Sequence, residues 1–284
     1  MTGILGGLFC AIFWCGAGTC SATCARVWGP IQSLAMGCLI GSIAIPLVAL
    51  VWVGVPHAPL SDWLWAVGYG VGTMLALTCI FRAYSMAKVG LVSAIVSTNG
   101  TIAALVSVAV LGEELPPAAI LATLIVGTGV CLAALREGDP ATGPRGGSDR
   151  VGAVFALLGA CGFAGAVLSG AQADTLDPIW VVAVGRLFGL VVVTVPVWLS
   201  GRLPKLDREI LPYAIGSPML DAAGFAALLI GSETGVAVPA VLSTLSAVFL
   251  ALVGHLVFRE RMSRLQWAGA LTTLAGVATL AATR

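Results

Sequence analysis

Two charged side chains, Arg186 and Asp221, lie deep within apolar stretches of the sequence and are the residues best suited to carry chemistry. Burying either charge in hydrocarbon costs several kcal/mol unless the charge is paired or hydrated. A buried carboxylate can take up a proton from one side and exchange it for a cationic solute, and a guanidinium can hold a carboxylate or a phosphate. Asp221 is therefore a candidate coupling or substrate-binding residue, with Arg186 as its partner or as an anchor for an anion. The alternative is a structural salt bridge between the two.

Other polar side chains in the apolar stretches are further candidates for contact with a solute. Asn99 carries an amide that can both donate and accept hydrogen bonds, although a bond between helices explains it equally well. Ser97, Thr101 and Thr244 offer hydroxyl groups. His255 can titrate near neutral pH and is a coupling candidate, or it forms a hydrogen bond at the membrane interface.

Small residues recur at alternating steps of four and three in two segments, which places each set on one helical face. Such a face either packs closely against another helix or forms the wall of a central cavity. The two sets are Ser93, Ser97, Gly100, Ala104 and Ser107, and Ala240, Thr244, Ala247, Ala251 and Gly254.

The elements that must position these residues are membrane helices. Of the 284 residues, 59% are hydrophobic and 10% are charged, which is too apolar for a water-soluble globular protein. Runs of about 20 apolar residues cross a bilayer as helices, because a helix satisfies its own backbone hydrogen bonds. We predict an all-α integral membrane protein with ten spans, at residues 3–22, 31–53, 63–81, 89–111, 118–135, 151–170, 179–199, 210–230, 236–258 and 265–282.

The ten spans form an internal repeat. Residues 136–150 are rich in Gly, Pro and charge, as expected of a solvated linker, and divide the chain into residues 1–135 and 151–284. A shift of 147 residues superimposes Glu113 on Glu260 and aligns small residues around them. Because each repeat has five spans, the second repeat must enter the membrane from the opposite face. Inverted repeats of this kind are typical of secondary transporters.

Two pairs of residues recur in the two repeats. Glu113 and Glu260 begin the short turn into the last helix of each repeat, where a carboxylate can accept from exposed N–H groups at a helix start. We interpret both as structural caps, with gating or binding as the alternative. Pro46 and Pro196 interrupt the second helix of each repeat and are candidate kinks or hinges.

The Lys and Arg residues of the loops are concentrated on one side. The loops after spans 1, 3, 5, 7 and 9 contain twelve of them, whereas the other face has only Arg284. Because basic loops stay in the cytoplasm, the bias predicts that these loops, including the linker at 136–150, are cytoplasmic and that both termini lie outside. Short loops suggest the inner membrane of a bacterium.

The sequence does not favour an enzyme, a metalloprotein or a nucleic-acid-binding protein. It contains no HExxH motif, no Ser nucleophile elbow and no phosphate-binding loop, so neither a cofactor nor a metal is expected. The eight cysteines show no zinc-ligand spacing, and no basic stripe with interleaved aromatics is present. The expected partners are a small solute, the lipid bilayer and protons as a coupling ion.

Two segments of the sequence, 92–135 and 239–282, share one pattern. Each is expected to contain a helix rich in small residues, a short turn with Glu, and a final helix that closes on Gly-Val. This pattern resembles the EamA-like branch of the drug/metabolite transporter superfamily, and the resemblance extends over essentially the whole chain. It implies a permease for a small solute, often an exporter of amino acids, metabolites or drugs. Many members are described with cytoplasmic termini, and the charge bias of this chain departs from that description.

The resulting expectation is a secondary transporter that moves a small polar or amphipathic metabolite by alternating access, with proton-coupled export preferred. An uptake permease or a solute exchanger is the alternative within transport. A membrane receptor or assembly factor that moves no solute is the alternative from another class, and would tolerate substitution of both Asp221 and Arg186.

Overall fold

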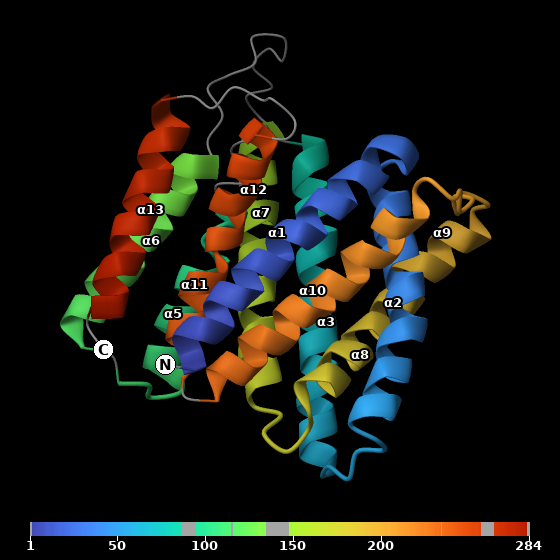
Figure 1. Ribbon diagram of the computed structural model, residues 1–284, viewed down its shortest axis with the longest axis horizontal. Coiled ribbons are helices and arrows are strands. Elements are labelled where there is room, and N and C mark those ends of the chain that lie inside the picture. The colour runs from blue at the N-terminus through green and yellow to red at the C-terminus, as the bar shows by residue number, and fades with distance from the viewer. Residues whose placement is uncertain are drawn as a thin grey trace.

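The fold is known from a computed structural model, which describes residues 2–86, 92, 95–114, 116–134, 148–233, 235–256 and 264–282. All regular secondary structure within these ranges is helical, as predicted (Figure 1). His255 lies in a described helix, but its side chain falls outside the described part of the chain, and so does Glu260.

Helices of the first half, apart from the late start of α5, follow the predicted spans. They are α1 (Thr2–Trp28), α2 (Pro30–Trp52), α3 (Leu60–Met86), α5 (Asn99–Val110) and α6 (Pro117–Ala134). Pro occupies the start of α2 and of α6, where the missing N–H breaks no helical hydrogen bond.

The second half contains interrupted helices. Its elements are α7 (Ser148–Ala171), α8 (Pro178–Gly189), the π-helical turn η1 (Leu190–Thr194), α9 (Val195–Leu199), α10 (Leu211–Ser232), α11 (Ala237–Ser243), α12 (Leu245–Leu256) and α13 (Arg264–Ala282). Because α7 begins at Ser148, the last residues of the predicted linker are helical.

Six helical segments of the described chain are long and apolar enough to cross a membrane. They are Thr2–Trp28, Pro30–Trp52, Leu60–Ile80, Arg150–Ala171, Pro178–Leu199 and Leu211–Ser232. The other four predicted spans contain shorter apolar helical segments, at Asn99–Val110, Pro117–Gly129, Ala237–Leu250 and Trp267–Val277. Many large apolar side chains, such as Trp52 at 80% exposure, face outward, as a lipid-facing surface requires.

Helices from the two halves pack against each other in pairs, α1 with α10, α3 with α7, and α6 with α13 (Figure 1). Small residues permit the close approach that such pairs need in a membrane. A Cβ on Gly6 would lie 2.6 Å from Gly231 Cα, between α1 and α10. Between α6 and α13, a Cβ on Gly129 would lie 2.5 Å from the Thr273 hydroxyl.

The two ends of the helix bundle differ in charge. The start of α1 and the end of α13 lie at the same end (Figure 1), and there the described loops carry Asp and Glu but no Lys or Arg. The described Lys and Arg residues, apart from Arg186, lie at the opposite end. These are Arg26, Arg82, Arg150, Arg202, Lys205, Arg208 and Arg264.

The predicted ninth span is broken, and α5 begins later than the fourth span was predicted to begin. At Thr98 and at Thr244 the helix is interrupted by a turn, and in both turns the Thr hydroxyl donates to the carbonyl three residues earlier, at 2.6 Å. The two breaks face each other, since a Cβ on Gly100 would contact the Ala240 carbonyl oxygen and lie 2.5 Å from Thr244 Cγ2. Apolar composition alone predicted continuous helices here.

Candidate solute-binding cavity

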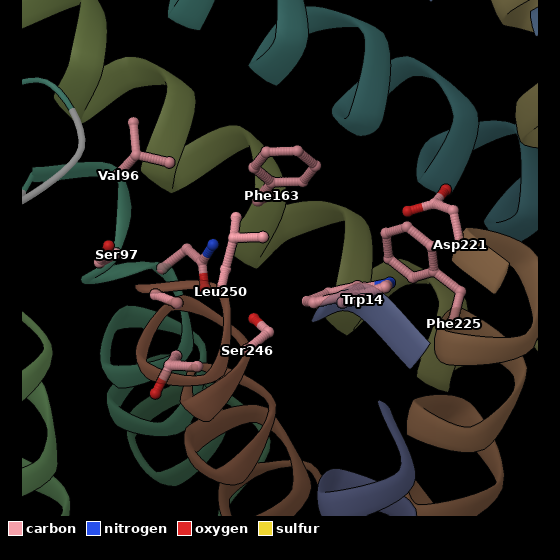
Figure 2. A pocket seen from close by; sticks show the side chains of 11 residues that line it. Trp14, Val96, Ser97, Phe163, Asp221, Phe225, Ser246 and Leu250 are labelled. Atoms are coloured by element: carbon pink, nitrogen blue, oxygen red, sulfur yellow. The ribbon is translucent and has the colours of Figure 1, made fainter. Parts of the chain in front are cut away.

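A cavity of about 280 Å³ lies where these interrupted helices meet α1, α7 and α10. Its lining combines residues from both halves of the chain (Figure 2). Asp221 and Phe225 lie on one side in that view, Ser97, Ser246 and Leu250 lie on the other, and Trp14 and Phe163 come between. The remaining lining residues are Val96, Asn99, Thr244 and Ala247.

Asp221 brings the only charged side chain to the described lining of this cavity, and it forms an ion pair with Arg186. The Arg186 Nη2 donates to Asp221 Oδ2. The two side chains differ in exposure, because 31% of the Asp221 side chain is exposed and only 11% of that of Arg186. Arg186 packs along α2, where a Cβ on Gly41 would lie 3.1 Å from its Cδ. The carboxylate therefore faces the cavity, and the guanidinium lies behind it.

Three aromatic rings form one cluster, and two of them, Trp14 and Phe225, line the cavity together with Asp221. Trp14 and Phe225 meet edge to face with ring centroids 4.8 Å apart, and Tyr69 contacts Phe225 in the same way at 5.2 Å. Phe225 lies one helical turn after Asp221, so both side chains project from the same face of α10. Gly224 permits this packing, because a Cβ there would lie 2.5 Å from Trp14 Cδ1. The rings of Trp14, Phe163 and Phe225 form the apolar wall of the cavity.

The polar groups of the lining retain hydrogen-bonding capacity. The Trp14 Nε1–H is buried and has no hydrogen-bond partner among the described residues. The Asn99 side chain likewise makes no hydrogen bond within the described chain, so the alternative of a bond between helices has no support there. The Thr244 hydroxyl donates to the Val241 carbonyl and keeps its lone pairs. A bound solute could satisfy the Asn99 amide and the lone pairs of the Thr244 hydroxyl.

The structure separates the two interpretations of the small-residue stripes. Ser97, Thr244 and Ala247 line the cavity, whereas Gly100 packs against α11. Ala104 and Ser107 are buried, and the Ser107 hydroxyl donates to the Ala104 carbonyl. The same helical face thus serves packing at one level and the cavity at another.

Thr101 lies away from the described lining of the cavity. A Cβ on Gly127 would lie 2.5 Å from the Thr101 hydroxyl oxygen, which places Thr101 between α5 and α6. Its position on the helix, two residues after Asn99, turns it toward the opposite side.

Glu113 contacts the start of a helix, but not of the helix that follows it in sequence. Its Oε2 accepts from the backbone N–H groups of Val236 and Ala237 at 3.0 and 3.1 Å, at the first turn of α11. Gly235 has φ +127°, and a Cβ there would collide with the Glu113 carboxylate. We expected Glu113 at the start of α6, but that helix begins with Pro117, whose nitrogen has no hydrogen to donate. The contact joins the two halves of the chain.

A second carboxylate joins the halves at the same end of the bundle. Asp62 Oδ2 accepts from the Thr175 backbone N–H at 2.8 Å and from its hydroxyl at 2.5 Å. Nearby, Trp180 Nε1 donates to the Gly54 carbonyl at 3.1 Å. Asp62 does not stand out in the sequence, because it lies at a predicted helix end, where a carboxylate is ordinary. The aromatic lining residues were also missed, since nothing distinguishes them in sequence from lipid-facing aromatics.

The comparisons with known proteins agree with the sequence resemblance. One solved structure, described only as "Crystal structure of protein", matches with a TM-score of 0.79 and 17% identity over 99% of this chain and 97% of that chain. At this identity the likeness concerns the fold. None of the curated proteins matches the chain. The model of the EamA-like transporter family matches residues 1–135 and 150–282. The chain is therefore a multi-pass membrane protein that belongs to the EamA-like transporter family, within the drug/metabolite transporter superfamily.

Proposed function

We propose that this protein is a secondary transporter that exports a small polar or amphipathic metabolite in exchange for protons, by alternating access to the cavity around Asp221. Membership of a transporter family supports transport of a small solute. The observation that supports this cavity as the site is that a partly exposed carboxylate lines it, at the junction of both halves of the chain.

The proposal includes ten spans in two inverted repeats. The contacts between helices support it, because α1 with α10 and α7 with α3 are equivalent pairs when the halves are exchanged. The breaks at Thr98 and Thr244, with the same hydrogen bond in each, also lie within one residue of equivalent positions under the shift of 147 residues. Interrupted helices at the midplane, related by such symmetry, are typical binding sites of secondary transporters.

The proposal also includes an orientation with both termini outside the cytoplasm. The distribution of the described Lys and Arg residues supports it, since they gather at the end of the bundle opposite the termini. The lipid bilayer in question is then the inner membrane of a bacterium. In this orientation the hydrogen bonds that Asp62 and Glu113 accept from the second half of the chain lie on the outer side of the membrane.

Proton coupling follows from competition at Asp221. A proton that binds Asp221 removes its charge, and this weakens both the ion pair with Arg186 and any attraction for a solute. If the proton and the solute cannot occupy the carboxylate together, each turn of the transport cycle carries one inward and the other outward. His255, at the end of α12, is the second candidate for the coupling residue.

The proposed function can be tested by solute flux in proteoliposomes that hold a mixture of amino acids and other metabolites, with and without an imposed pH gradient. We expect gradient-driven flux for the wild type and its loss in Asp221→Asn. The double variant Arg186→Met/Asp221→Asn leaves neither charge unpaired, so loss of flux there reports the missing carboxylate rather than poor folding. Asp174→Asn, in an exposed loop, is the matched control.

The alternatives give different results in the same assay. Gradient-driven flux that survives Asp221→Asn would move the coupling site elsewhere, with His255 next. Counterflow that persists without a pH gradient would indicate an exchanger, and inward flux an uptake permease. An absence of flux for every solute, with both charged positions tolerant of substitution, would indicate a receptor or an assembly factor.

A further inference from the structure

The cavity has a chemical preference that follows from which member of the ion pair faces it. We infer that the solute is an amphipathic organic cation, whose ammonium group binds Asp221 and whose apolar body packs among Trp14, Phe163 and Phe225. This inference rests on the proposed function, which it deepens by naming the class of solute.

The first step is the orientation of the ion pair. Asp221 is among the residues that line the cavity, whereas Arg186 is not, and the guanidinium side chain is the more buried of the two. A solute that enters the cavity therefore meets a carboxylate. An anionic solute would have to displace Asp221 before it could reach Arg186.

The second step is the capacity of the carboxylate. Its two oxygens offer about four lone-pair sites in all, so the bond from Arg186 Nη2 to Oδ2 leaves room for further donors. An ammonium group can thus bind Asp221 while Arg186 stays in place. Arg186 then holds the carboxylate in position and prevents it from turning away from the cavity.

The third step is the aromatic wall. A cation is attracted to the face of an aromatic ring, and Trp is the strongest partner. Trp14 and Phe225 both contribute to the lining beside Asp221, and Phe163 lies across from them (Figure 2). The edge-to-face contact between Trp14 and Phe225 fixes the two rings at an interplanar angle of 73°. Rings at such an angle present differently directed faces to a ligand between them.

Polar groups also lie on the opposite side of the cavity from Asp221. Ser97 and Ser246 appear there in Figure 2, with Asn99 and Thr244 also in the lining. They suit a hydroxyl or carbonyl group at the far end of the solute. A bare hydrocarbon amine would leave the Asn99 amide without a hydrogen-bond partner among the described residues, so a second polar group should improve binding.

The test is isothermal titration calorimetry on the purified full-length protein in detergent micelles. Three probes share one apolar body and differ in charge: 2-phenylethylamine, 2-phenylethanol and 3-phenylpropanoate. We expect the amine to bind at least about tenfold more tightly than the alcohol, and the carboxylate to bind most weakly. Equal affinities, tighter binding of 3-phenylpropanoate, or no binding of the amine at millimolar concentration would overturn the inference.

Variants locate the amine within the cavity. Asp221→Asn and the double variant Arg186→Met/Asp221→Asn should both weaken amine binding about tenfold or more and leave binding of the alcohol unchanged. Phe163→Leu should weaken amine binding about threefold to tenfold. Phe9→Leu is its matched control, because Phe9 is 51% exposed on the outer surface of α1. Amine binding that is unchanged in both Asp221 variants would refute the assignment.

The binding and flux measurements together distinguish an incorrect solute class from an absence of transport. Amine binding in micelles without flux in proteoliposomes would support the solute class and count against transport. Gradient-driven flux of the alcohol or the carboxylate, without binding of the amine, would support transport and overturn the solute class.

Discussion

The ion pair between Arg186 and Asp221 makes a quantitative prediction about folding. Removal of one partner of a buried pair leaves an uncompensated charge and costs about 3–5 kcal/mol. Asp221→Asn leaves the charge of Arg186 without a partner. Because only 11% of the Arg186 side chain is exposed, we expect a loss of about 3–5 kcal/mol in the free energy of unfolding. Arg186→Met leaves the charge of Asp221 without a partner. Because 31% of the Asp221 side chain is exposed and can be hydrated, we expect a smaller loss of about 1–3 kcal/mol in the free energy of unfolding.

The double variant distinguishes a true pair from two independent sites. Removing both charges leaves nothing unpaired and is often close to neutral. The two single substitutions should therefore cost together about 4–8 kcal/mol more than the double substitution. The assay is unfolding of the purified protein in mixed micelles by titration with sodium dodecyl sulfate, followed by tryptophan fluorescence.

A control cycle uses two exposed residues at opposite ends of the bundle, Asp174→Asn and Arg202→Met. Their effects should add within about 0.5 kcal/mol. The same additivity for Arg186 and Asp221 would refute the pairing, and a larger cost for Arg186→Met than for Asp221→Asn would refute the reasoning from exposure.

Three further predictions concern other parts of the fold. Glu113→Gln should lower the free energy of unfolding by about 1–3 kcal/mol, because the carboxylate accepts hydrogen bonds from two backbone N–H groups at the start of α11. The same substitution at the exposed Glu114 should have little effect in the same titration. Gly100→Ala should reduce both stability and flux because its Cβ would contact the Ala240 carbonyl, whereas Gly37→Ala, with nothing within 4 Å, should be neutral or stabilising by up to about 1 kcal/mol. Alkaline phosphatase fused to the C-terminus should be active in intact bacteria and a fused green fluorescent protein should be dark, and the reverse pattern would contradict the orientation with termini outside.

Most of the fold could be predicted from the sequence because the bilayer allows so few solutions. A long apolar run without charge must satisfy its own backbone, and a helix does so. The last helix, at Arg264–Ala282, therefore lies within one residue of the predicted span at 265–282. The breaks at Thr98 and Thr244 could not be predicted in this way, because each lies within a long apolar run, and the few polar residues beside it do not by themselves end a membrane helix. At each break a Thr hydroxyl donates to the carbonyl three residues earlier, but this bond also occurs in unbroken helices, where the Ser107 hydroxyl makes it within α5.

The candidate site was only partly predictable. The cost of a buried charge was enough to single out Arg186 and Asp221, and it favoured their pairing. Which of the two faces the cavity depends on the packing of α2 around Arg186, and sequence contains no signal for that. The partner of Glu113 lies 123 residues later in the chain, so its contact needed the tertiary structure. Trp14 and Phe163 look in sequence like the many aromatic residues that face lipid.

The π-helical turn at Leu190–Thr194 determines how α8 and α9 would respond to the deletion of a residue. Pro196 supplies no N–H, and the backbone N–H of Val195 reaches back five residues to the Leu190 carbonyl. A turn of this kind holds one residue more than an α-helical turn, and one residue corresponds to about 100° of helical rotation. Deletion of one residue between Val191 and Val193 would restore a regular helix, but it would turn Arg186 by that angle relative to Trp198. The contact of Thr194 with the Ala35 carbonyl could then no longer coexist with the salt bridge to Asp221. A single-residue deletion at this turn should therefore be far more damaging than a substitution at the same position.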